Sequence, residues 1–372
     1  MDVHIIYIAI IGGGVAGLSL AAGLIKNPHI VVLVFEAVAK YDDVGAGFAL
    51  HKNAIKAMTC IGQDVVKAYF DKATMMGEAD DVIATHLILA QGPHAGLKVA
   101  ELGKAKGRKT LSRADLLDGF RALLPDGCIT YGKRLRKCID LGTPQKDGVL
   151  LIFEDESVKR VDCVLGADGI HSVVRAHVLG EEDPAVKPRN HDRWRIYRTM
   201  VPTEEARKQI NPKWTENVPI LLGPRGHINC IPLNKNTRLS AGVAVRGVAK
   251  VPEVSPLPPL DPSLYEDYIE DAQQIVRMVA KDTDKSWAAS DHDDARTYYK
   301  GHVAVLGDAA HAALPFAGNG AAQALEDAAV LNVLFKAVKR REQINTALEA
   351  YCKTRITRSQ AVVRLSRQFG RV

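Results

Sequence analysis

The sequence predicts an α/β protein with an interposed β-sheet domain and a C-terminal helix. Residues 5–11 form a continuous apolar, β-branched run, which is typical of a strand buried on both faces, and a glycine turn and a helical pattern follow it. Strand-like patterns dominate residues 193–248. Helical patterns cover residues 54–70, 321–339 and 343–368. Strands alternate with helices at both ends of the chain and dominate its middle, which is why we expect this class.

The length of the chain is compatible with two domains. It has 372 residues, of which 47% are hydrophobic, enough to bury a sizeable core. We expect a discontinuous first domain (residues 1–185 and 290–340), a β-sheet domain (residues 186–289) and a C-terminal helix (residues 341–372). Lys and Arg number 49 against 43 Asp and Glu. This surplus is too small to indicate nucleic-acid binding, and an ordinary charged surface or a mild preference for phosphorylated cofactors would explain it.

Neither the cysteines nor the apolar N-terminal run indicates a special class of protein. The six cysteines form no C-x-x-C pair, so we expect no metal site and a reducing compartment such as the cytoplasm. Residues 5–25 carry no charge, which raises the possibility of a membrane span. The run contains five glycines and no basic residue precedes it, so a buried strand and a buried helix explain it better than a transmembrane segment or a signal peptide.

The first glycine turn has the pattern of a dinucleotide-binding site. Gly12, Gly14 and Gly17 form G-x-G-x-x-G between a predicted strand and a predicted helix, and Glu36 ends the next strand. In such a turn the first glycine allows the tight bend, the second lets backbone approach a pyrophosphate, and the third lets the helix pack on the strand. An acid at the end of the second strand accepts hydrogen bonds from ribose hydroxyls. These residues predict a Rossmann-like nucleotide-binding unit.

Two further glycine–acid motifs follow predicted strands. Residues 164–175 read VLGADGIHSVVR, and Asp168 stands where the strand gives way to a helix. Residues 302–306 lead into Gly307-Asp308 and then into a loop and an alanine-rich helix. Small residues let the backbone come close to a ligand. A simple nicotinamide dehydrogenase needs only one such turn, so three indicate a larger cofactor. We interpret His311 as structural.

The three motifs together resemble the class A FAD-dependent monooxygenases. This aromatic hydroxylase family includes salicylate and para-hydroxybenzoate hydroxylases, and the chain is most similar to its fungal salicylate-hydroxylase-like branch. The family has an N-terminal G-x-G-x-x-G, an internal D-G motif and a late G-D motif, and the chain has all three in that order. The resemblance implies a GR2-type FAD-binding domain of the para-hydroxybenzoate hydroxylase fold, into which the β-sheet substrate domain is inserted.

The resemblance also implies which residues bind FAD. Asp308 corresponds to the aspartate that binds the ribityl chain, Pro315 to the proline beside the isoalloxazine ring, and Arg113 to the arginine that reaches the cofactor. Gly45-Ala46-Gly47 corresponds to a second flavin-contacting loop. The complete predicted set is Gly12, Gly14, Gly17, Glu36, Gly47, Ala49, Arg113, Asp168, Asp308, Pro315, Gly318, Gly320 and Ala321.

The predicted substrate sheet offers two candidates for catalysis. Alternation along residues 193–201 places Arg198 on the same face as Trp194 and Ile196, where a guanidinium suits a phenolate or a carboxylate. His227 opens a strand that the family directs at the cavity, and it is a candidate acid or base. An ordinary sheet arginine and a solvated turn histidine remain the alternatives.

The expected activity is that of a single-component FAD-dependent monooxygenase of secondary metabolism. The resemblance implies that NADH or NADPH reduces FAD, that O2 then gives a C4a-hydroperoxyflavin, and that this species oxygenates an electron-rich aromatic or heteroaromatic small molecule. A second G-x-G-x-x-G is absent from the sequence, which fits transient nicotinamide binding. An indole epoxidase or a phenol-dearomatising enzyme of the same fold is the alternative, and a non-catalytic flavin-fold chaperone is a distant one. We expect a monomer or a homodimer.

Overall fold

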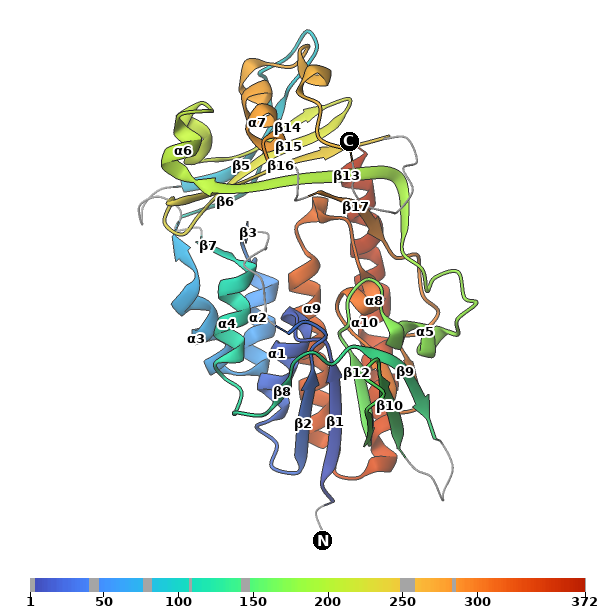
Figure 1. The fold of residues 1–372 in the computed structure, drawn as a ribbon. Coiled ribbons are helices and arrows are strands. Elements are labelled where there is room, and N and C mark those ends of the chain that lie inside the picture. The colour runs from blue at the N-terminus through green and yellow to red at the C-terminus, as the bar shows by residue number, and fades with distance from the viewer. Residues whose placement is uncertain are drawn as a thin grey trace.

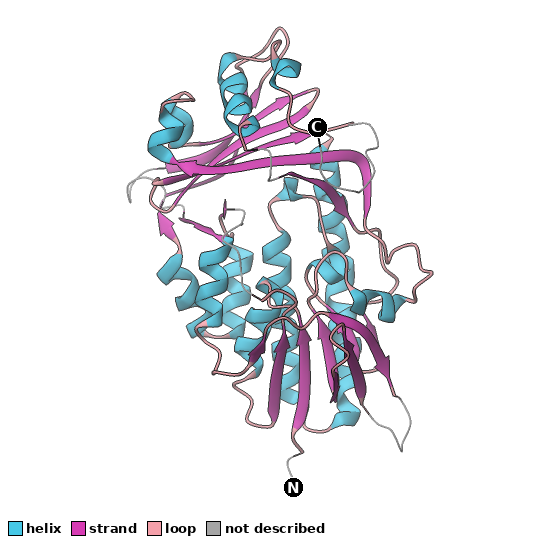
Figure 2. Ribbon diagram, in the orientation of Figure 1, coloured by secondary structure: helices cyan, strands magenta, loops and turns pink. Residues whose placement is uncertain are grey.

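The structure is a computed structural model that describes residues 4–39, 47–75, 82–106, 109–141, 148–247, 258–282 and 286–371. It has two stacked parts, a parallel-sheet domain covered by helices and a broad sheet that lies across its end (Figure 1). Most helices gather around the parallel sheet, and the other part consists mainly of strands (Figure 2). None of the helices in the described ranges is long and apolar enough to cross a membrane.

The parallel sheet is built around the predicted N-terminal strand. Its order is β18-β19-β12-β1-β2-β8, and β18 alone runs antiparallel to its neighbour. The strand β1 is apolar throughout and lies at the centre, with Ile8, Ala9 and Ile10 fully buried. The strands of this sheet are β1 (Ile6–Ile11), β2 (Ile30–Phe35), β8 (Ile129–Thr130), β12 (Cys163–Gly166), β18 (Tyr299–Lys300) and β19 (Val303–Val305).

Helices cover the parallel sheet and include the predicted C-terminal helix. The long helix α9 lies against α1 and α2 on one side and α10 on the other. The helix predicted over residues 54–70 is interrupted, because Gly62 has extended backbone, and it forms α2 and α3. The helices are α1 (Val15–Leu24), α2 (Lys52–Ile61), α3 (Gln63–Lys72), α4 (Arg113–Arg121), α5 (Val173–Leu179), α8 (Asp308–His311), α9 (Gly320–Ala337) and α10 (Ile344–Gly370).

The second part is a seven-stranded sheet of order β17-β13-β16-β15-β14-β5-β6. All its pairs are antiparallel except β14 with β5. The helices α6 (Thr203–Arg207) and α7 (Glu270–Ala280) lie on the face away from the parallel sheet (Figure 1). The strands are β5 (Val82–Leu89), β6 (Lys98–Lys106), β13 (Arg189–Pro202), β14 (Val218–Gly223), β15 (Gly226–Leu233), β16 (Arg238–Val245) and β17 (Ser286–Asp291).

This sheet differs from the prediction in one respect. We expected its strands within residues 186–289, but β5 and β6 come from the range assigned to the first domain. β5 pairs with β14 over Thr85–Leu89, a contact between residues more than 130 positions apart that leaves no local pattern. The chain therefore enters the seven-stranded sheet twice.

The remaining elements are short. There are two three-stranded sheets: β3-β7-β4 lies between the two parts, and β11-β10-β9 lies beside the parallel sheet (Figure 1). Their strands are β3 (Gly47–Phe48), β4 (Thr74–Met75), β7 (Lys109–Ser112), β9 (Leu135–Asp140), β10 (Val149–Phe153) and β11 (Val158–Val161). The 3-10 turns are η1 (Pro212–Thr215), η2 (Pro262–Tyr265), η3 (Pro315–Ala317) and η4 (Arg341–Gln343).

Candidate functional site

The three glycine motifs meet at one edge of the parallel sheet. They follow β1, β12 and β19, which are adjacent and parallel, so their carboxyl ends lie side by side. A Cβ placed on Gly12 would lie 2.3 Å from the carbonyl oxygen of Ala167, so the first turn touches the D-G segment. The N–H of Leu306 in turn donates to the carbonyl oxygen of Gly166 (2.9 Å). Ligands of open α/β sheets bind outside this end of the strands.

The glycines of the first turn have different neighbours. Gly12 has a φ of +103°, and a Cβ on Gly17 would lie 2.0 Å from the carbonyl oxygen of Gly12. Both are therefore required by the fold itself. A Cβ on Gly14 would meet only a guanidinium nitrogen of Arg113, at 3.7 Å. The space in front of Gly14 is thus open toward Arg113, as expected for a position that a pyrophosphate approaches.

Glu36 lies beside this turn, where the prediction places it. Its carboxylate accepts hydrogen bonds from the N–H groups of Gly13 (2.6 Å) and Val38 (2.9 Å). These contacts hold the carboxylate at the carboxyl end of β2, next to the N-terminus of α1. Its binding to a ribose stays a prediction.

Asp168 has a structural explanation that we did not predict. Its carboxylate accepts hydrogen bonds from the N–H groups of Val173 (2.8 Å) and Val174 (3.2 Å) and from the Ser172 hydroxyl, so it caps α5. The same segment supplies Arg175, whose side chain is fully buried and donates to the carbonyl oxygens of Ala185, Ala309 and Ala310. Arg175 therefore fastens the D-G segment to α8. The contact of Asp168 with a cofactor stays a prediction.

Asp308 differs from its neighbours in exposure. Gly307, Ala309 and Ala310 are buried, while the Asp308 side chain is exposed at the N-terminus of α8. The surrounding protein nevertheless raises the pKa of its carboxyl, against the opposing positive charge of His311 and Arg113. The Asp308 carboxylate is therefore accessible to a ligand at the N-terminus of α8.

A buried ion network that the sequence analysis missed supports the G-D turn. Asp327 is fully buried and accepts hydrogen bonds from the Gly307 N–H (2.8 Å), His311 Nε2 (2.6 Å) and Arg355 Nε (2.6 Å). Burial alone would raise the pKa of Asp327, but His311 and Arg355 hold it below its ordinary value. His311 is thus structural, as we predicted. The available signal in the sequence was an aspartate in one predicted helix, Asp327, and an arginine in the next, Arg355.

The segment between the G-D turn and α9 has open space beside it. Pro315 is exposed, and Cβ atoms placed on Gly318 or Gly320 would meet no heavy atom within 4 Å. The helix α9 begins at Gly320, and the side chain of its N-cap residue, Asn319, does not accept a hydrogen bond from the first N–H groups of the helix. The first N–H groups of this 18-residue helix, those of Gly320 and Ala321 included, can therefore bind a negatively charged group of a ligand.

The second predicted flavin-contacting loop is described only in part. Gly45 and Ala46 lie outside the described residues. A Cβ on Gly47 would lie 2.4 Å from a methyl carbon of Leu233, so close packing of β3 on the seven-stranded sheet explains this glycine. Ala49 is half-buried. The structure thus gives Gly47 a packing role and leaves its contact with a flavin as a prediction.

The seven-stranded sheet presents Arg198 toward the parallel-sheet domain. Trp194 and Ile196, on the same face of β13, pack with Leu314, and Phe316 joins them, whereas Tyr197 belongs to the core beneath α7. The guanidinium carbon of Arg198 lies 5.6 Å from the centre of the Trp287 ring, and burial lowers the pKa of Arg198. Within the described part of the chain, no carboxylate pairs with this half-buried cation. It is a candidate for binding an anionic ligand.

His227 belongs to an aromatic cluster between the two parts of the molecule. Its ring contacts Phe316 (5.0 Å between centroids) and Trp194 (5.7 Å), in both cases edge to face. Phe316 directly follows Pro315, so this cluster connects the predicted substrate sheet to the predicted flavin-side turn. The structure therefore brings His227 and Pro315 into one region, as the prediction requires.

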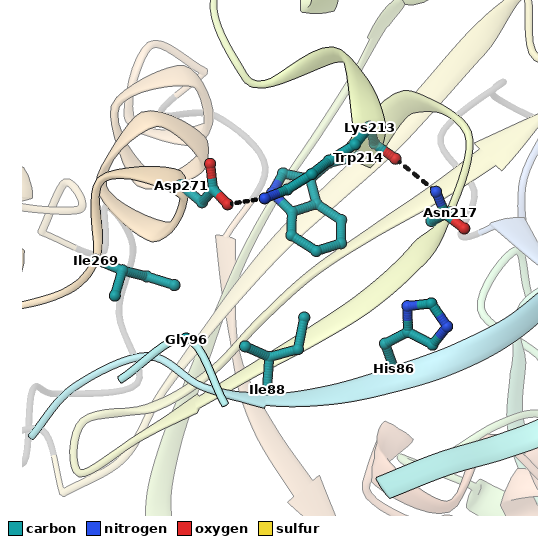
Figure 3. A pocket seen from close by; sticks show the side chains of 8 residues that line it. All are labelled: His86, Ile88, Gly96, Lys213, Trp214, Asn217, Ile269 and Asp271. Carbon is teal, nitrogen blue, oxygen red and sulfur yellow. Dashed lines mark hydrogen bonds and ion pairs between the residues drawn. The ribbon is translucent and has the colours of Figure 1, made fainter. Parts of the chain in front are cut away.

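One pocket lies elsewhere. It has a volume of about 360 Å³ and opens on the α7 side of the seven-stranded sheet, away from the glycine motifs (Figure 1, Figure 3). Lys213 and Asp271 form an ion pair at 2.6 Å beside it, and the Asn217 amide donates to the Lys213 carbonyl oxygen (3.0 Å). The residues that line it are His86, Ile88, Gly96, Lys213, Trp214, Asn217, Ile269 and Asp271.

Comparison with known proteins agrees with this geometry. The family model described as "FAD binding domain" matches residues 145–366. The 6-methylsalicylate 1-monooxygenase atA of Aspergillus terreus is 35% identical over 98% of this chain and 82% of its own length. The chain belongs to the FAD-dependent monooxygenases. A salicylate hydroxylase of Pseudomonas putida is 32% identical over 86% of this chain and 74% of its own length.

The solved structures support the same family. A salicylate hydroxylase substrate complex superimposes with a TM-score of 0.78 at 28% identity, over 98% of this chain and 88% of the hydroxylase. This confirms the predicted α/β hydroxylase fold with its C-terminal helix. The named relatives are monooxygenases, so the family is one of enzymes and not of non-catalytic chaperones. The described residues of this monooxygenase contain no cluster of three or more His, Cys, Asp or Glu side chains that could hold a metal ion.

Proposed function

We propose that this FAD-dependent monooxygenase uses NADH or NADPH and O2 to add one oxygen atom to an electron-rich aromatic or heteroaromatic small molecule. The observation that supports it best is the open edge at which three glycine motifs, the exposed Asp308 and the free N-terminus of α9 converge. Bound FAD would supply the activation of O2 and the oxygen transfer. The protein supplies binding, orientation and exclusion of water.

The residues at this edge fit a dinucleotide. We propose that Gly14 and the N-terminus of α1 receive the pyrophosphate, that Arg113 adds positive charge beside it, and that Glu36 binds the adenosine ribose. Asp308, whose side chain makes no hydrogen bond within the described residues, is available for the ribityl hydroxyls. The N–H groups at the start of α9 would stabilise negative charge on the reduced ring.

Arg198 supports an anionic or phenolic substrate. Among the described residues this half-buried guanidinium contacts the Trp287 ring and pairs with no carboxylate, so it has donors for a carboxylate or a phenolate of the substrate. Two relatives named above act on salicylates by name, which favours an aromatic hydroxy acid within this class. His227 is the second residue that we propose for this cavity, as an acid, a base or a hydrogen-bond partner.

The test is a turnover screen with the FAD-loaded protein. NADH and NADPH oxidation would be followed with salicylates, other phenols and indoles, and each product would be analysed by mass spectrometry. We expect a product heavier than its substrate by one oxygen atom, and a preference for phenols that carry a carboxylate. Equal turnover of neutral phenols and phenols that carry a carboxylate would contradict the substrate class. A protein that binds no FAD would contradict the proposed function.

A further inference from the structure

The last turns of the C-terminal helix contact the flavin-side turn directly. The Ser366 hydroxyl is fully buried, accepts a hydrogen bond from the Ala317 N–H (3.0 Å) and donates to the Leu314 carbonyl oxygen. These two groups bracket Pro315 and Phe316. The Ser366 side chain therefore forms hydrogen bonds with the backbone at both ends of η3. A short turn of this kind has few backbone hydrogen bonds of its own.

The same helix end also contacts the seven-stranded sheet. Arg367 forms an ion pair with Asp291 on β17, through Nε (2.8 Å) and Nη2 (3.0 Å). A Cβ on Gly370 would lie 2.6 Å from the Phe316 ring and 3.2 Å from the Trp194 ring. The end of α10 is thus packed between the turn and the sheet, and small movements of the helix would move both.

We propose that Ser366 is a positioning residue for the monooxygenase reaction, which sets the place of Pro315 and Phe316 relative to the substrate sheet. Ser366 acts through the backbone of η3 and touches neither substrate nor cofactor. The inference rests on the proposed flavin site, because Pro315 is predicted to lie beside the flavin ring. A hydroxyl that determines where this turn lies should influence the environment of the ring and the coupling of NAD(P)H oxidation to product.

A matched control is available on the same helix. Ser359 is also fully buried on α10, about two helical turns before Ser366, and its hydroxyl contacts the Tyr298 hydroxyl (2.8 Å) and donates to the Arg355 carbonyl oxygen (3.0 Å). Ser359→Ala and Ser366→Ala each remove one buried hydroxyl from one helix. A purely structural role of Ser366 predicts that the two variants behave alike.

The experiment compares the parent, Ser366→Ala, Ser359→Ala and Gly370→Ala, each loaded with FAD. For Ser366→Ala we expect a changed visible absorption spectrum of the bound flavin, about fivefold weaker FAD binding, and a larger share of NAD(P)H converted to hydrogen peroxide. Gly370→Ala should change the spectrum and the coupling in the same way, because its methyl group displaces Phe316. Ser359→Ala should keep the parental spectrum and coupling.

Two outcomes separate the possible failures. If the parent binds FAD and Ser366→Ala keeps its spectrum, its FAD affinity and its coupling, the positioning role is wrong while the proposed function stands. If the parent itself binds no FAD, the proposed function fails first. The melting temperature of each apoprotein shows whether a variant is folded, and the spectrum is compared only among folded proteins.

Discussion

Gly14 and Gly17 belong to one motif, but their surroundings assign them different tasks. The Cβ that a substitution adds at Gly17 would lie 2.0 Å from a backbone oxygen, which cannot move without opening the turn. At Gly14 the Cβ would meet only the mobile end of Arg113. At the scale of single residues, therefore, the structure separates positions needed for folding from positions needed for a ligand.

We predict opposite behaviour for the two valine variants. Gly17→Val should fail to give a folded protein, because its side chain overlaps the Gly12 carbonyl. Gly14→Val should fold with a melting temperature of the apoprotein close to the parent and should bind no FAD. Circular dichroism and a FAD titration would measure this. A Gly14→Val protein that binds FAD with parental affinity would remove Gly14 from the cofactor site.

Asp308→Ala should impair FAD binding and leave folding unchanged. The side chain is exposed and makes no hydrogen bond within the described residues, so its loss costs the apoprotein little. A charge-assisted hydrogen bond to the cofactor is worth about 1.5–3 kcal/mol, or roughly ten- to hundredfold in Kd. The measurement is FAD affinity by fluorescence quenching, with Asp308→Asn as the variant of matched size. Equal affinities in parent and Asp308→Ala would place Asp308 outside the site.

Arg198 should affect coupling more than flavin reduction. Arg198→Lys keeps the charge but loses the planar guanidinium, so its turnover should be lower than that of the parent. The turnover of Arg198→Ala should be lower still, and more of the NAD(P)H should be converted to hydrogen peroxide. Product formed per NAD(P)H consumed is the quantity to measure, with FAD occupancy checked in each sample. Fully coupled variants at parental rates would make Arg198 a structural residue of the sheet, and His227 would be tested next.

At the scale of elements, the helix pair α9 and α10 carries the network that supports the G-D turn. Asp327 on α9 joins Gly307, His311 and Arg355, and the last of these comes from α10. Glu326, beside it, accepts hydrogen bonds from Arg355 (2.6 Å) and Arg358 (2.7 Å), and these arginines help to hold its pKa at about 2 even though burial opposes this. The turn that carries Asp308 is therefore held by two helices that follow it in the chain.

The pH dependence of Asp327→Asn follows from this network. The folded-state pKa of Asp327 lies below its ordinary value of 3.8, so the stabilisation by its carboxylate is fully present above that value and is lost as the pH falls through the folded-state pKa. We expect Asp327→Asn to lower the free energy of unfolding by about 3–5 kcal/mol near neutral pH, because it leaves His311 and Arg355 without their buried partner.

Denaturant unfolding of the two proteins between pH 7 and about pH 3 would measure this difference. Below about pH 4 the gap between parent and Asp327→Asn should narrow. A gap that widens below about pH 4 would have the wrong sign and would contradict the assignment of an ionised Asp327.

At the scale of the whole molecule, contacts of α10 and η3 help to fix the seven-stranded sheet over the parallel-sheet domain. The ion pair of Arg367 with the buried Asp291 is one, and the cluster of Trp194, Phe316 and His227 is another. Both involve α10 or η3 next to it, so the chain end helps to define the space between the two parts.

Arg367→Ala should loosen this connection. It leaves the 1%-exposed Asp291 without its guanidinium partner, and we expect a loss of about 3–5 kcal/mol in the free energy of unfolding. Arg364→Ala on the same helix is the control, because Arg364 pairs with the half-exposed Asp294 and its removal should cost less than about 1 kcal/mol. Similar losses in the two variants would show that the Arg367 pair has no special role.

The sequence alone determined what depends on local pattern. The strand, glycine turn, helix and acid of residues 5–36 and the three cofactor motifs follow from spacing and residue type, and the structure and comparisons confirm the fold and family they indicate. Only the tertiary structure decided how distant segments meet. It placed β5 beside β14 and brought Asp327, Arg355 and Ser366 to the G-D turn and η3. Such contacts depend on strand order and helix packing, because residues that are 20 to more than 130 positions apart leave no periodic signal in the chain.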